Sequence, residues 1–483
     1  MTLPALMISA AHKSSGKTTL TLGLAAAFAA RGLAVQTFKK GPDYIDPMWL
    51  ALASGRPCFN LDAYLMGEAA VPASFADHAA GADLALVEGN KGLYDGLALD
   101  GSNSNAALAH QLGLPVVLVI DARGMTRGVA PLILGYQAFD RQIRIAGVIL
   151  NRLGGSRHEA KLRAVIEHYT DVPVLGAVQH DERLAVTERH LGLVPACELA
   201  DATRQVGALA AAVEAQVDLD RLQAVAGQSL PVAGGAEPLP RVAEPRPSAG
   251  GRRLRIGIAR DRAFGFYYAD DLLALEAAGA QLITIDTLAD TRLPALDGLF
   301  IGGGFPEVHM AALSANAALR QALREAIAAG LPTYAECGGL MYLSRTLRWN
   351  DRQLPMVGAI PGDVVMHERP VGRGYVHLQE TGDFPWPGDG APAAVRAHEF
   401  HHSSLDNLGP ETRFAYRVRR GHGIDGRHDG VVVGNLLASY AHRHSAGVEG
   451  WAPRFMAFVQ QQRAERECAA CAARAPQREA LTV

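Results

Sequence analysis

Short apolar runs rich in β-branched residues alternate with alanine-rich stretches of helical period from Leu6 to about Val213. This alternation is typical of βα units on a parallel sheet, because a strand covered on both faces is apolar throughout whereas each covering helix carries one apolar stripe. The strands that the pattern predicts lie at 6–10, 33–39, 84–89, 115–121, 145–151 and 172–178.

The apolar pattern lapses and then resumes. Residues 226–253 are dense in proline, glycine and alanine and lack apolar periodicity, which is typical of an interdomain linker. Apolar runs return at 254–260, 280–286, 298–304 and 331–336, with helical spacing at 271–279. We therefore predict an α/β protein with a parallel-sheet domain over 1–215, a linker over 216–252, a second α/β domain over 253–463 and a flexible tail over 464–483.

The composition is that of an ordinary globular protein, with 49% hydrophobic and 20% charged residues. A net charge of -3 gives no bulk attraction to nucleic acid or to an anionic membrane. The sequence shows neither a secretion signal at its start nor an apolar stretch of membrane-spanning length. We expect a cytoplasmic protein that binds neither nucleic acid nor membrane, and a homodimer is a working hypothesis.

A phosphate-binding loop is predicted at 11–19, AHKSSGKTT, between an apolar strand and a helical run. Backbone N–H groups and the helix N-terminus can cradle phosphates there, Lys17 can reach the β and γ phosphates, and the Thr18 hydroxyl can ligate Mg²⁺. Ala11 replaces the first glycine of the motif, so we expect the turn to form without a residue free to adopt positive φ. An ordinary glycine-containing turn is the alternative. We assign ATP to Ser15, Gly16, Lys17, Thr18 and Thr19.

Mg²⁺ between two phosphates needs further oxygen ligands, which usually sit at strand ends. Glu88 ends one predicted strand and Asp43 follows another, and we assign both to the metal with the threonine of the loop. Lys39 and Lys40 can neutralise phosphoryl charge. Asp43 and Asp46 stand beside prolines, so turn formation is the alternative role for both.

Cys337 is the candidate nucleophile, because it follows a predicted strand directly and precedes two glycines and a helical run. Small neighbours permit the sharp turn of a nucleophile elbow, and a helix N-terminus favours the thiolate. Cys58 and Cys197 lack this setting and suit small buried apolar positions. Cys468 and Cys471 form a lone CxxC, and the five cysteines together do not predict a disulfide framework.

A cysteine nucleophile needs a base, and two histidine clusters compete for that role. One is HEFHH at 398–402 and the other is HRH at 442–444; spacing alone does not choose between them, and zinc binding is an alternative for the first. The glycine run at 302–304 offers backbone N–H groups close to a reacting carbonyl. We assign the oxyanion hole to Gly303, Gly304 and Gly338.

Beyond the two candidate sites, the chain carries the motifs KKGPDYIDP at 39–47, EGNKGLYDG at 88–96, GVILNR at 147–152, GGGFPE at 302–307, YAECGGLMYL at 334–343 and HEFHHSS at 398–404. In these motifs and their order, the chain resembles the cobyrinic acid a,c-diamide synthase family along nearly its whole length. The resemblance implies a dethiobiotin-synthetase-like P-loop domain that phosphorylates a substrate carboxylate with ATP and Mg²⁺, followed by a class I glutamine amidotransferase domain.

The resemblance also implies residue roles. ASYAHRH at 438–444 is similar to the family pattern SYxHxH, which makes His442 the general base. His444 then stands where related glutaminases carry a glutamate, so the third member of their triad would be lacking, and the HEFHHSS block would lie nearer the domain interface or the acceptor pocket. Cys337 would attack L-glutamine, and the ammonia would attack an acyl phosphate. Lys40 and Asn151 would join the ATP site.

The acceptor that the resemblance implies is a tetrapyrrole with acetate side chains, amidated at the a and c positions of cobyrinate. Asn90 and Asn103 depart from the usual family motifs and resemble a branch that amidates sirohaem or sirohydrochlorin, which is the alternative. A partition-type P-loop ATPase, or a scaffold with an inert glutaminase half, is the alternative from another class. We assign substrate contacts to Tyr44, Asp46, Asn90, Tyr94 and Asn103.

Overall fold

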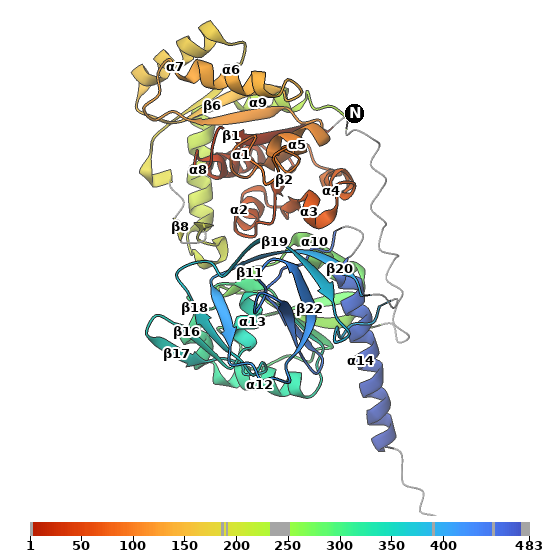
Figure 1. Ribbon diagram of the computed structural model, residues 1–483. Helices are drawn as coiled ribbons and strands as arrows, with labels where there is room; N and C mark the ends of the chain where they lie inside the picture. Colours follow the sequence, from red (N-terminus) through yellow and green to blue (C-terminus); the bar gives the residue numbers. More distant parts are fainter. Residues whose placement is uncertain are drawn as a thin grey trace, which may run out of the picture. The chain divides into compact units, whose positions relative to one another are not determined.

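The computed structural model describes residues 3–184, 188–189, 192–231, 252–388, 392–446 and 450–474. It divides into two compact units, Met1–Leu239 and Pro240–Val483, each with a sheet and a core of its own (Figure 1). The predicted α/β class is therefore confirmed, and it follows from apolar strands that are buried over their whole length.

The first unit contains a parallel sheet of seven strands in the order β3-β2-β4-β1-β5-β6-β7. Helices cover both faces, with α6 and α7 on one side and α1, α2 and α8 on the other (Figure 1). The strands are β1 Ala5–Ala10, β2 Val35–Lys40, β3 Phe59–Leu61, β4 Leu84–Glu88, β5 Val116–Asp121, β6 Ile145–Leu153 and β7 Val174–Gln179. The helices are α1 Lys17–Ala30, α2 Ile45–Ser54, α3 Ala63–Met66, α4 Ala70–Ala79, α5 Asn105–Gln111, α6 Val129–Phe139, α7 Ser156–Tyr169, α8 Ala202–Gln216 and α9 Leu219–Ala226.

The first unit extends beyond its predicted end. Within the range 216–252 that we expected to be a linker, helix α9 packs its apolar side into the core, and Asp218 caps it by accepting a hydrogen bond from the Arg221 N–H at 3.0 Å. Beyond the helix, Leu230 N–H donates to Gly113 O at 2.9 Å. The predicted linker therefore began too early. Helix α9 is too short for its apolar residues to form a clear periodic pattern, and a proline- and glycine-rich stretch follows it.

The second unit contains a mixed sheet of nine strands in the order β12-β10-β13-β15-β24-β23-β22-β19-β20. The strands from β12 to β24 are parallel, and the rest pair antiparallel. The bounds are β10 Leu254–Ala259, β12 Ala280–Ile285, β13 Gly298–Ile301, β15 Thr333–Glu336, β19 Gly372–Glu380, β20 Ala394–His401, β22 Arg413–Arg420, β23 His428–Val433 and β24 Leu436–Ser439. Smaller sheets join β11 Phe264–Phe266 with β14 Gly303–Gly304, and β16 Thr346–Trp349 with β17 Arg352–Pro355, β18 Asp363–Met366 and β21 Ser403–Asp406. The helices are α10 Ala269–Ala277, α11 Met310–Ala315, α12 Ala317–Ala328, α13 Gly338–Leu343 and α14 Trp451–Arg474.

The C-terminal helix α14 runs further than the predicted domain end at 463. Residues 464–474 of the expected flexible tail are helical, whereas 475–483 lie outside the described residues. Trp451, Phe455 and Val459 bury one side of this helix in the core, which explains its order. In the part of the chain that the structure describes, no helix is both long and apolar enough to cross a membrane.

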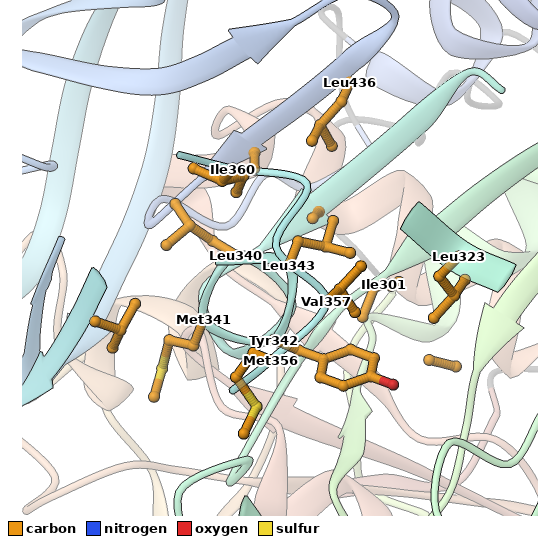
Figure 2. Packing of buried hydrophobic residues seen from close by; sticks show 14 of the residues in the cluster. Ile301, Leu323, Leu340, Met341, Tyr342, Leu343, Met356, Val357, Ile360 and Leu436 are labelled. Carbon is orange, nitrogen blue, oxygen red and sulfur yellow. The ribbon is translucent and has the colours of Figure 1, made fainter. Parts of the chain in front are cut away.

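Helix α13 is short, and all of its residues are buried. Leu340, Met341, Tyr342 and Leu343 insert into a cluster that also contains Ile301, Met356 and Ile360 (Figure 2). A helix of this length gains little from its own hydrogen bonds, so this packing fixes its position. Because Cys337 directly precedes α13, the packing of this helix also fixes the position of Cys337.

Parallel pairing brings distant motifs together at the carboxyl ends of strands. In the first unit, Glu88 at the end of β4 lies opposite Lys39 of β2, and β1, which leads into the phosphate loop, pairs with the other side of β4. In the second unit, Glu336 at the end of β15 lies opposite Ser439 at the end of β24. Cys337 and His442 therefore follow neighbouring strand ends.

Candidate functional site

The phosphate loop connects β1 to α1, as its sequence predicts, and takes its positive φ angles from Ser14 at 62° and Gly16 at 88°. Ser14 therefore adopts positive φ in this turn although it carries a Cβ, which the sequence did not predict. A Cβ on Gly16 would lie 2.1 Å from Asn151 Nδ2, so only glycine fits there. The Asn151 amide donates to Ser15 O at 2.9 Å, which places Asn151 against the loop.

Polar side chains gather at the start of α1, where Lys17, Thr18 and Thr19 stand. Thr18 Oγ1 donates to Glu88 Oε1 at 2.7 Å and lies 3.3 Å from Asp46 Oδ2. The Lys39 ammonium bridges the same two carboxylates, at 2.6 Å from Asp46 Oδ2 and 2.9 Å from Glu88 Oε1.

Three hard oxygen donors on Thr18, Asp46 and Glu88 fit Mg²⁺. The other Glu88 oxygen, Oε2, is buried and accepts no hydrogen bond from the described residues, which leaves an acceptor available to a cation.

Asp46, rather than Asp43, lies beside Thr18. The Asp43 carboxylate instead accepts hydrogen bonds from the N–H groups of Ile45 at 2.9 Å and Asp46 at 3.0 Å, which is the turn chemistry that we had weighed as an alternative. The assignment of Asp43 to the metal stays a prediction, and Asp46, which we assigned to substrate, joins the candidate metal ligands. The two residues are so close in sequence that spacing did not show which one would face the loop.

Burial controls the charges of this site. It lowers the pKa of Lys17 to about 8, although the charge of Glu88 opposes the shift. Burial also lowers the pKa of Lys40 to about 8, and the Lys40 ammonium donates to Asn103 O at 2.9 Å, away from the two carboxylates that Lys39 bridges. Burial raises the pKa of Glu88. A polyphosphate bound at the loop would stabilise the charge of Lys17.

The residues assigned to substrate lie in the segments that follow β2 and β4. Asn90 lies against Gly41, where a Cβ would be 3.0 Å from its Nδ2. The Tyr94 hydroxyl donates to Tyr136 O at 2.7 Å, and the Tyr136 hydroxyl donates to Ala11 O in the loop. The remaining two are Tyr44, buried at the start of α2, and Asn103, whose carbonyl meets Lys40.

Cys337 adopts φ 46° and ψ -101° between β15 and α13, so the predicted strand–turn–helix geometry of a nucleophile elbow is present. Positive φ is strained for a residue with a Cβ, and such strain persists only where the surroundings hold it. The Cys337 N–H donates to Ser439 O at 2.7 Å, which ties the turn to the end of β24.

His442 is the histidine that meets this thiol. His442 Nδ1 lies 3.1 Å from Glu336 Oε2, and the charge of Cys337 acts on the same imidazole. Burial opposes a charge on His442, but the hydrogen bonds and negative charges of Cys337 and Glu336 outweigh burial and raise the pKa of His442 to about 10. The structure thus places His442, of the second histidine cluster, where it can act on the thiol.

The HEFHHSS block lies beside this histidine. His398 and His442 pair through both backbone hydrogen bonds, at 3.0 and 2.7 Å, and His401 stacks on Tyr440 with ring centres 3.8 Å apart. This strand supports the segment that carries His442, and its place nearer an interface or acceptor pocket stays a prediction. Among the described residues, no group of three or more His, Cys, Asp or Glu side chains could hold a metal, so zinc finds no support there.

Family models and curated relatives point to one family. A CobQ/CobB/MinD/ParA nucleotide binding domain matches residues 6–193, and a CobB/CobQ-like glutamine amidotransferase domain matches 255–449. The chain is 48% identical to the cobyrinate a,c-diamide synthase of Magnetococcus marinus, with 94% of this chain and 97% of that relative covered. It is 41% identical to the enzyme of that name from Methanosarcina acetivorans, with 92% of each covered. The chain belongs to the cobyrinate a,c-diamide synthase family.

Membership in this family makes the protein a carbon–nitrogen ligase that takes nitrogen from glutamine. The relatives match over nearly their whole length, with both domains in the same order, so the partition-type ATPase and the inert scaffold are disfavoured. The nucleotide binding domain that matches over 6–193 carries the phosphate loop, which agrees with the use of ATP.

Two acidic residues at the thiol site were missed in the sequence. Glu336 supplies a carboxylate to His442, from the residue before Cys337 rather than from position 444. His444 instead lies 3.5 Å from Asp270. Asp429 accepts hydrogen bonds from the N–H groups of Tyr440 and Ala441, both at 3.0 Å, and so fixes the segment before His442. A glutamate that ends an otherwise apolar buried strand needs a partner, and that signal was available.

Gly303 is expected to be irreplaceable in this amidotransferase. A Cβ at this position would lie 2.8 Å from His442 Cε1, so Gly303→Ala must displace the imidazole. A misplacement of about 1 Å lowers a catalytic rate by roughly 100-fold. We expect the rate of glutamine hydrolysis in Gly303→Ala to fall roughly 100-fold, with little change in the melting temperature.

The matched control is Gly409→Ala, where an added Cβ meets nothing within 4 Å. It should keep the wild-type rate. Equal rates for the two alanine variants would show that His442 does not need its observed position.

Proposed function

We propose that this protein uses ATP, Mg²⁺ and L-glutamine to convert the a and c acetate carboxylates of cobyrinate into amides, a step of cobalamin biosynthesis. The observation that carries the proposal is the presence of two chemical centres in one chain, the phosphate loop with its acidic cluster and the Cys337–His442 pair. The names of relatives that match over more than nine-tenths of the chain support the choice of acceptor.

We place glutamine hydrolysis in the second unit. The Cys337 sulfur would attack the amide carbon of glutamine, and its proton would pass through His442 to the departing ammonia. Backbone N–H groups around Gly304 and Gly338 would stabilise the oxyanion, since Gly338 lies so close that a Cβ there would be 2.9 Å from Gly304 N. Water then releases glutamate from the thioester.

We place carboxylate activation in the first unit. A carboxylate oxygen of the acceptor would attack the γ-phosphorus of ATP, ADP would leave, and ammonia would then displace phosphate from the acyl phosphate. Lys17 and Lys39 stand where they can neutralise the charge of the transferring group. Thr18, Glu88 and Asp46 would hold Mg²⁺, which supplies further neutralisation of phosphate charge when bound.

Sirohaem is the second candidate acceptor. Asn90 and Asn103, which distinguish this chain from the usual family motifs, lie at Gly41 and Lys40 beside the activation site, where polar groups can discriminate one macrocycle from another. Both acceptors carry ring acetates, so the chemistry is the same for either.

The acyl phosphate is tested by following oxygen. An acceptor labelled with ¹⁸O in its carboxylates is incubated with ATP, Mg²⁺ and glutamine, and the inorganic phosphate is examined by mass spectrometry. Because the carboxylate attacks phosphorus, one labelled oxygen should leave with each phosphate formed. Unlabelled phosphate together with an amidated product would contradict activation by phosphorylation.

A further inference from the structure

We propose that Glu336 is the positioning residue for His442, so that the thiol site is a line of three side chains, Cys337, His442 and Glu336, with the acid supplied by the residue next to the nucleophile. The inference rests on the proposed role of Cys337 and His442 in glutamine hydrolysis. It adds a residue to which the motifs gave no function.

The Glu336 carboxylate is fixed on every side. Its Oε2 faces His442 Nδ1 at 3.1 Å, while its Oε1 accepts hydrogen bonds from the Tyr334 hydroxyl at 2.6 Å and the Arg443 N–H at 3.0 Å. The exposed fractions of Glu336 and His442 are 1% and 3%. A buried carboxylate with this many donors keeps one orientation, and it therefore imposes one orientation on the imidazole.

Adjacent residues reach the same imidazole because of the fold. Glu336 ends β15 opposite Ser439, and the unusual turn at Cys337 redirects the chain so that the next side chain also reaches the histidine. With the carboxylate at Nδ1, the imidazole proton is held there, and Nε2 becomes the acceptor for the thiol proton. Glu336 also stabilises the imidazolium that forms when the thiol ionises.

The other ionisable groups around the pair do not replace this charge. Burial lowers the pKa of His398, beside His442, to about 3, so that ring is neutral. Burial raises the pKa of Asp271, on the side of Glu336. The Arg443 guanidinium lies 3.3 Å from the Tyr416 hydroxyl. Glu336 is therefore the carboxylate whose charge stabilises the His442 imidazolium, and the sulfur of Cys337 is the other negative group beside it.

The test is Glu336→Gln, which keeps the size of the side chain and removes its charge. We expect kcat for glutamine hydrolysis to fall roughly 100-fold or more, with KM for glutamine changed by less than about threefold. Loss of the charge destabilises the imidazolium and lowers the pKa of His442, so the alkaline limb of the pH profile should move to lower pH. Amidation with free ammonia should stay at the wild-type rate, which also shows that the variant is folded.

The matched control is Glu399→Gln, another buried carboxylate, which lies 3.9 Å from His401 rather than at His442. The pH profile of Glu399→Gln should be the same as that of the wild type. A wild-type rate for Glu336→Gln, a loss confined to KM, or an alkaline limb that stays in place would overturn the proposal.

The wild-type protein gives a second readout that needs no variant. In ¹⁵N-histidine NMR spectra, His442, assigned through Cys337→Ala, should show a protonated Nδ1 with a far-downfield proton. A protonated Nε2 with a bare Nδ1 would overturn the role of Glu336. Absence of glutaminase activity in the wild type, or its survival in Cys337→Ala, would instead refute the proposed function.

Discussion

Replacement of Cys337 by alanine is expected to abolish amidation with glutamine and to preserve amidation with ammonium salts. The sulfur is the atom that we propose attacks the amide, and His442 and Glu336 have no other nucleophile to activate. Loss of a nucleophile typically lowers a rate by several powers of ten, so we expect at least ~1,000-fold for the glutamine reaction. Product amide is measured by mass spectrometry with each nitrogen source.

The cavity left at Cys337 is small, and α13 remains anchored through Leu340 and Leu343 in the core, so the variant should fold. Cys468→Ala, at an exposed position on α14, is the matched control and should behave as wild type. If a folded Cys337→Ala protein lost activity with ammonia as well, the two chemical steps would not be separable as we propose.

Replacement of Lys17 by alanine is expected to abolish amidation with both nitrogen sources. Lys17 opens α1 at the phosphate loop, and its side chain is buried at the site where we propose phosphoryl transfer. Removal of one group that neutralises transition-state charge costs about 100- to 1,000-fold in rate. Calorimetric titration with ATP should show weaker binding, and release of ADP in the presence of acceptor should fall in parallel.

Lys13→Ala provides the matched control, because Lys13 lies in the same loop with an exposed side chain. It should retain the wild-type affinity for ATP. Undiminished ammonia-dependent amidation in Lys17→Ala would remove the phosphate loop from the mechanism that we propose.

The sequence predicted the features that show as a local pattern of residues, namely the central strands and the two strand-to-helix motifs. Apolar runs located the long central strands, and the setting of Gly16–Lys17 and of Cys337, each between a strand and a helix, located both centres. Such contexts are local in sequence, and parallel pairing then fixes where they lie in the fold. Strand β3 escaped the analysis because Phe59–Leu61 is too short to show a pattern.

Contacts between side chains could not be predicted in the same way. We assigned Asp43 to the metal and Asp46 to substrate from the sequence, whereas in the fold Asp43 accepts a hydrogen bond within its own turn and Asp46 meets Thr18. The contact between Glu336 and His442 joins residues that are 106 positions apart, and it depends on the adjacency of β15 and β24. Sequence analysis of one chain contains no information on that adjacency.

The most direct test of the central claim is mass spectrometry of reactions that contain ATP, Mg²⁺ and glutamine with either cobyrinate or sirohaem as acceptor. Each conversion of an acid to an amide lowers the mass by a small, defined amount. We predict two successive decreases for cobyrinate, each dependent on ATP and glutamine, and none for sirohaem. Conversion of sirohaem alone would make Asn90 and Asn103 substrate determinants and contradict the proposed acceptor, and conversion of neither would contradict amidation of these tetrapyrroles altogether.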